Sequence, residues 1–122
     1  MMITPKQEKL IAQSTHYMYI KTDRQPPFIM AGAYVFLEEI KTKDFNLIGS
    51  DIYVLAYENG AKQFVAGRRE RHTLWFVDIR TGAAVKLSKD GALTLYKVRL
   101  VKSGDVEVPD KLMLLHDQIA IN

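Results

Sequence analysis

The chain has 122 residues, of which 48% are hydrophobic and 25% charged, and its formal net charge is +3; this size and composition predict one globular domain, residues 1–122, with a core of its own. The absence of cysteine excludes disulfides, thiol nucleophiles and cysteine-based zinc sites. The first ten residues lack an apolar signal-peptide core, and the longest apolar run, residues 28–37, is far shorter than the roughly 20 residues of a membrane helix, so we expect a cytoplasmic protein that makes no contact with a membrane.

A helix is predicted at the N-terminus, over residues 5–19. Thr4 is a suitable N-cap, Pro5 suits the first helical position, and Gln7 lies where a capping box requires it. One face of this helix would carry Leu10, Ile11, Ser14, Tyr17 and Met18. The end of the helix is left open, because residues 15–20 are also rich in strand-forming side chains.

The next segment follows the Pro26–Pro27 pair, which bars a helix and favours an extended linker. Residues 29–41 then fit two structures. The same run is apolar enough for a buried strand, yet it also contains a helical stripe formed by Ile29, Ala33, Phe36, Leu37 and Ile40. The length of the run and its closing sequence EEIK favour the helix, with the strand as the alternative.

From residue 50 onward, short runs rich in Val, Ile, Tyr and Phe alternate with the turn dipeptides Asn59–Gly60, Thr81–Gly82, Asp90–Gly91 and Ser103–Gly104. Asn-Gly and Asp-Gly favour hairpins, because type I′ turns need a positive φ at both central residues. We therefore predict an α+β fold, in which N-terminal helices within residues 1–45 pack on a five- to six-stranded antiparallel meander over residues 50–108 that can curl into a small barrel. The apolar C-terminal segment, residues 109–122, fits either a short helix over 110–120 or a last strand.

No pattern for catalysis or for a cofactor stands out. His16, His72 and His116 lie far apart, and none has a second ligand at a metal-binding spacing. The glycines are single and mark turns, so there is no glycine-rich phosphate loop. Ser50 lies in a predicted turn without a neighbouring base, which favours a turn residue over a nucleophile. We therefore expect no cofactor, no metal and no enzymatic activity.

Basic residues are concentrated in the second half of the chain. Residues 60–102 contain ten Lys or Arg and three Asp or Glu, a net charge of +7, whereas the rest of the chain carries −4. Such asymmetry favours a polyanion or an acidic partner surface as the ligand. Within this segment Arg68, Arg69 and Arg71 cluster between two predicted strands, in what we expect to be an exposed hairpin loop. Guanidinium groups bind phosphate and carboxylate through paired hydrogen bonds and stack on bases.

Strand alternation extends this cluster onto a sheet face. Lys86, Lys97 and Arg99 alternate with apolar neighbours and are predicted to line one outer face, which Tyr53 and Tyr57 share as candidates for stacking on bases. The sequence thus predicts a non-enzymatic protein that binds nucleic acid through its basic loop and this face. The alternative is a protein–protein interaction or inhibitor module whose basic loop docks on an acidic partner surface. An ordinary solvated sheet face, rich in Lys and Arg, has the same pattern.

Overall fold

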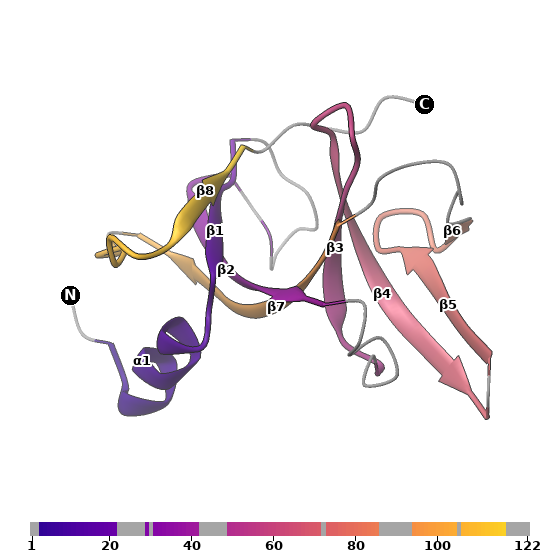
Figure 1. Cartoon of the computed structure of the whole chain (residues 1–122), viewed down its shortest axis with the longest axis horizontal. Coiled ribbons are helices and arrows are strands. Elements are labelled where there is room, and N and C mark those ends of the chain that lie inside the picture. The colour runs from indigo at the N-terminus through magenta and orange to yellow at the C-terminus, as the bar shows by residue number, and fades with distance from the viewer. Residues whose placement is uncertain are drawn as a thin grey trace. The chain divides into compact units, whose positions relative to one another are not determined.

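The computed structural model of the chain describes residues 3–21, 29, 31–41, 49–71, 73–85, 94–104 and 106–116 (Figure 1). In these residues one short helix is followed by eight strands. The elements are α1 (Pro5–Ala12), β1 (His16–Tyr19), β2 (Ala33–Ile40), β3 (Ile52–Ala56), β4 (Lys62–Glu70), β5 (Thr73–Asp78), β6 (Ala84–Val85), β7 (Thr94–Ser103) and β8 (Met113–Leu115). Across the described residues, no helix has the length and apolar character that crossing a membrane requires.

The strands hydrogen-bond in the order β6-β5-β4-β3-β7-β2-β1-β8. The β1–β8 pair is parallel and the β1–β2, β3–β4, β3–β7, β4–β5 and β5–β6 pairs are antiparallel, so the sheet is mixed. The predicted α+β fold is therefore wrong: the described chain is mostly sheet, and one short helix stands in place of the expected helical layer. The predicted meander is also wrong as a whole, because β7 pairs with β3 instead of extending the sheet beyond β6.

The start of α1 is as predicted, but its end is not. The hydroxyl of Thr4 accepts a hydrogen bond from the Gln7 backbone N–H, and the Gln7 side chain accepts one from the Thr4 N–H, both at 3.1 Å, which completes the capping box. The helix stops at Ala12 instead of continuing to residue 19. The Thr15 N–H already donates to the carbonyl of Leu37 at 2.8 Å, so the strand-forming residues that follow are bound into the sheet as β1.

The segment predicted as a helix over residues 29–41 forms strand β2. It pairs antiparallel with β1, in a register that joins His16 to Leu37 and Tyr19 to Tyr34. The consecutive residues Val35, Phe36 and Leu37 are all fully buried, although neighbouring side chains on a strand point to opposite faces. A strand covered on both faces shows a continuous apolar run rather than alternation, and such a run cannot be distinguished from a buried helix by periodicity.

Two of the predicted hairpins are confirmed. Residues 57–61 connect β3 to β4, and Gly60 among them has a φ of 92°, which glycine adopts without strain. Asn59 does not have the positive φ that the predicted type I′ turn requires, so the hairpin lies where it was expected but its turn is of another type. The turn at Thr81–Gly82 connects β5 to β6. The predicted Asp90–Gly91 turn lies outside the described residues. At the C-terminal end, the strand alternative is correct for β8, which pairs with β1, while residues 117–122 lie outside the described part of the chain.

The chain divides into two compact units, and each has a hydrophobic core. Unit 1 comprises Met1–Glu39 and Val98–Asp117, and its core is centred on Ile11, Phe36 and Leu112. Unit 2 comprises Ile40–Lys97 and Gln118–Asn122. Its buried core residues are Tyr53, Leu55, Val65, Phe76 and Leu95. Unit 2 contains the β4–β5 hairpin and, with it, the predicted arginine cluster.

Candidate functional site

The three clustered arginines lie at the end of the β4–β5 hairpin. Arg68 and Arg69 belong to strand β4 itself, and only Arg71 lies in the connection, with a φ of 56°. The register pairs Arg68 with Trp75 and Glu70 with Thr73, so only two residues connect the strands, and the positive φ of Arg71 is the geometry favoured in so short a connection. The predicted exposed hairpin is therefore correct, but its loop is shorter than expected, because strand pairing continues through the arginines.

The three arginines project from the end of the hairpin in different directions. All three are exposed, as is Glu70 between them. Adjacent positions on a strand project to opposite faces, so Arg68 and Arg69 lie on opposite sides of the ribbon while Arg71 lies at its tip. Strand β3 pairs with β4 only as far as Ala66, so in the described residues the arginine-bearing end pairs with β5 alone. This geometry presents guanidinium groups in several directions from a narrow two-stranded ribbon.

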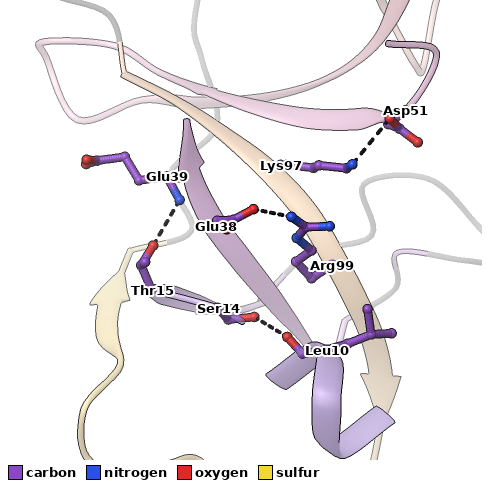
Figure 2. Close-up of polar contacts among 8 residues, drawn as sticks. All are labelled: Leu10, Ser14, Thr15, Glu38, Glu39, Asp51, Lys97 and Arg99. Atoms are coloured by element: carbon purple, nitrogen blue, oxygen red, sulfur yellow. Dashed lines mark hydrogen bonds and ion pairs between the residues drawn. The ribbon is translucent and has the colours of Figure 1, made fainter. Parts of the chain in front are cut away.

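The predicted basic sheet face is not a free surface. Lys97 pairs with Asp51 at 3.5 Å between Nζ and Oδ2, and Arg99 pairs with Glu38 (Figure 2). Both cations are half-buried, and Lys86, the third predicted member, lies outside the described residues. Basic residues can be counted along each expected strand in the sequence. The carboxylates that lie beside them in the fold cannot, because they come from other parts of the chain.

The two tyrosines predicted for base stacking lie against the core. Tyr53 is 1% exposed, its ring meets that of Phe76 edge-on at 5.8 Å, and its hydroxyl accepts a hydrogen bond from the Gly49 N–H at 3.0 Å. Tyr57 is half-buried against the same core. The expected outer face of β3 is thus its core face. The alternation of side chains along β3 did not identify its exposed face, because Val54, on the face opposite Tyr53, is also fully buried.

A polar network continues from Tyr57. Its hydroxyl donates to Oε1 of Gln63, and the Gln63 amide donates to Oδ2 of Asp78 at 2.8 Å. Burial and the nearby Asp78 charge raise the pKa of Tyr57. Burial alone would raise the pKa of Asp78, but hydrogen bonds from Gln63 and from the backbone N–H groups of Arg80 and Thr81 outweigh it, so this pKa is lowered. The network fixes the β5–β6 turn.

The lowered pKa of Asp78 predicts a pH dependence of stability. The carboxylate stabilises the fold fully above its unfolded pKa, near the ordinary value of 3.8, and this contribution is lost as the pH falls through the lower folded value. We expect Asp78→Asn to be less stable than the wild type at pH 7, and the difference to shrink at pH 3. Urea unfolding of both proteins at the two pH values measures it. A difference that stays constant would show that the ionised carboxylate contributes nothing.

Beyond these contacts, little points to a known chemistry. Among the described residues, no group of three His, Asp or Glu side chains is placed to hold a metal ion. No protein-family model, curated protein or solved structure matches the chain.

Sequence reasoning missed the residues that share a face with Arg68. In the hairpin register Trp75 lies directly opposite Arg68, and Val77 lies opposite Ala66. Trp75 and Val77 are half-buried, and Ile52, which pairs with Ala66 from the other side, is an exposed large hydrophobic residue. The hairpin turn was the missing signal: once it is set at two residues, the pairing of Arg68 with Trp75 follows.

A second group of partly exposed apolar side chains lies in unit 1. The rings of Tyr19 and Tyr34 pack at a centroid distance of 5.1 Å, and Tyr19 and Leu114 are 42% and 46% exposed. These residues come from β1, β2 and β8. No arginine or lysine cluster accompanies them in the described strands, so their surroundings do not define a ligand.

Proposed function

We propose that the chain is a non-enzymatic nucleic-acid-binding protein that contacts phosphates through the end of the β4–β5 hairpin. One observation carries the proposal: three exposed arginines lie together at one end of a two-stranded ribbon. Arg68 and Arg69 lie on its opposite faces, and Arg71 lies at its tip. Only one acidic residue, Glu70, lies among them.

The chemistry of this end suits a polyanion. Guanidinium groups bind phosphate oxygens through paired charge-assisted hydrogen bonds, and they remain charged at any physiological pH. A two-stranded ribbon is also narrow enough to approach a nucleic-acid backbone or groove. Arg68 donates one hydrogen bond within the chain, from Nη1 to the Gly67 carbonyl at 3.0 Å, and its other donor groups retain the capacity to bind a ligand.

The proposed site is smaller than the one expected from the sequence. Lys97 and Arg99 are paired with carboxylates, and Tyr53 is buried, so none of them is included. The proposed site therefore consists of Arg68, Arg69 and Arg71. The sequence alternative, an acidic protein surface docked on the same arginines, uses the same charges, and the test below distinguishes the two ligands.

Replacing all three arginines tests the proposal. We expect the Arg68→Ala, Arg69→Ala, Arg71→Ala triple variant to bind labelled oligonucleotides more weakly than the wild type at low salt. Each phosphate contact contributes about 0.7–0.9 to the slope of log affinity against log salt, so the slope should become shallower by about 2–3. Stability should change by less than about 0.5 kcal/mol per site, because the side chains are exposed. Fluorescence anisotropy at several salt concentrations measures the affinity.

A matched control removes three exposed charges elsewhere. The Lys6→Ala, Lys9→Ala, Arg80→Ala variant has the same net charge as the hairpin variant, and all three of its substituted residues are exposed. We expect its salt slope to stay close to that of the wild type. Equal losses in the two variants would show that only net charge matters. A wild type that binds no oligonucleotide at low salt would overturn the proposal and leave the acidic protein partner as the explanation.

A further inference from the structure

We propose that the ligand is single-stranded nucleic acid and that one of its bases stacks on Trp75 while Arg68 holds a neighbouring phosphate; this inference rests on the proposed function. The surface involved is the Arg68 face of the hairpin, defined here as Ile52, Arg68, Trp75 and Val77.

The register brings cation and indole together. Arg68 and Trp75 are directly opposite residues of an antiparallel pair, so their side chains leave the same face with Cβ atoms about 4.5–5.5 Å apart. Arg68 is exposed and Trp75 is half-buried, so part of the indole is accessible. An arginine beside an accessible aromatic ring is the combination by which proteins hold unpaired bases.

The apolar neighbours explain why a single strand is favoured over a duplex. Ile52 is 36% exposed and Val77 is half-buried on the face that carries Arg68. Phosphates of a duplex gain nothing from apolar side chains, and the bases of a duplex are already stacked on one another. An unpaired base has a free aromatic face that removes this apolar surface from water.

The opposite face of the hairpin is covered at Gly67 and Phe76. There Arg69 follows Gly67, and the aromatic residue opposite Gly67 is Phe76, which is only 2% exposed. The backbone of residues 49–51 covers this face: the Gly67 N–H donates to the Asp51 carbonyl at 2.9 Å, and a Cβ on Gly67 would clash with the Gly49 carbonyl oxygen. Arg69 projects from this covered face, on the side of the ribbon opposite Trp75, and it serves as the matched control for Arg68.

The single tryptophan makes the inference directly measurable, because all indole fluorescence comes from Trp75. We expect saturating unlabelled single-stranded oligonucleotide to quench this fluorescence strongly, and a duplex of the same sequence to quench it weakly. Trp75→Leu, which keeps an apolar side chain, should weaken single-strand binding about 5- to 140-fold and leave duplex binding nearly unchanged. Trp75→Phe should lose much less affinity, since a ring remains.

Comparing Arg68→Ala with Arg69→Ala tests which face of the hairpin binds the single strand. Arg68→Ala should weaken single-strand binding more than Arg69→Ala does, whereas the two variants should lose duplex affinity alike. At saturation, Arg69→Ala should still show the full quenching of the wild type. Circular dichroism confirms folding of each variant, and the wild-type quenching experiment decides even if Trp75→Leu fails to fold.

The outcomes separate this inference from the proposed function. Salt-dependent binding seen by anisotropy, with no tryptophan quenching and equal affinity for single strands and duplexes, would overturn the stacking inference and leave phosphate binding by the hairpin intact. No binding of either oligonucleotide would overturn both.

Discussion

Tyr53→Ala is expected to lower the free energy of unfolding by about 3–5 kcal/mol, as for other large aromatic residues removed from a core. Tyr53 is 1% exposed and packs with Leu55, Val65, Phe76 and Leu95. Alanine would leave a cavity among these side chains. Because the total stability of a domain is about 5–15 kcal/mol, a loss of this size removes much of it. Urea unfolding followed by circular dichroism measures the change.

Tyr53→Phe is the matched control for this substitution. It keeps the ring against Phe76 and removes only the hydroxyl that accepts from the Gly49 N–H, so we expect a loss of about 1 kcal/mol. Oligonucleotide binding by Tyr53→Phe should equal that of the wild type. Weakened binding with unchanged stability would instead show that Tyr53 belongs to the binding surface, as the sequence alone suggested.

Gly67→Ala is expected to destabilise the fold by about 1–3 kcal/mol through overpacking. A Cβ at this position would clash with the Gly49 carbonyl oxygen and would lie 3.1 Å from Cε2 of the buried Tyr53 ring. The Gly49 oxygen is a backbone atom whose segment is tied to β4 by the hydrogen bond from the Gly67 N–H to the Asp51 carbonyl, so it cannot turn aside as a flexible side chain can. Thermal and urea unfolding measure the loss.

Gly49→Ala provides the comparison on the other side of the same contact. Among the described residues, a Cβ on Gly49 would meet only Oδ2 of Asp51, at an ordinary 3.6 Å, so we expect a change within about 0.5 kcal/mol. If Gly67→Ala were as stable as the wild type, residues 49–51 would not cover this face of β4.

The number of basic residues in the sequence overestimates the positive charge that is available to a ligand. The net charge of +7 over residues 60–102 is correct, yet Lys97 is paired with Asp51, just before β3, and Arg99 is paired with Glu38 of β2. A half-buried cation beside a carboxylate contributes less to the attraction of a polyanion than an exposed one. Charge available for binding therefore depends on which strands are neighbours, and sequence composition does not contain that information.

The sequence by itself determined the features that depend on a few consecutive residues. The capping box of Thr4 and Gln7 sets the start of α1, and Asn59–Gly60 sets the β3–β4 turn. The hairpin bearing Arg68, Arg69 and Arg71 was likewise expected where it is found. In each case the stabilising contact lies within one turn of helix or one tight turn of chain, so local chemistry is sufficient.

Only the tertiary structure decided which surfaces are buried and which strands are neighbours. Residues 15–19 leave the helix because β2 offers them hydrogen bonds, and β2 is a strand because both of its faces are covered. The same cause places Tyr53 in the core. Each strand has two faces, and either of them can pack against the core. Residues distant in sequence determine which face is buried, because their own burial stabilises one arrangement over the other.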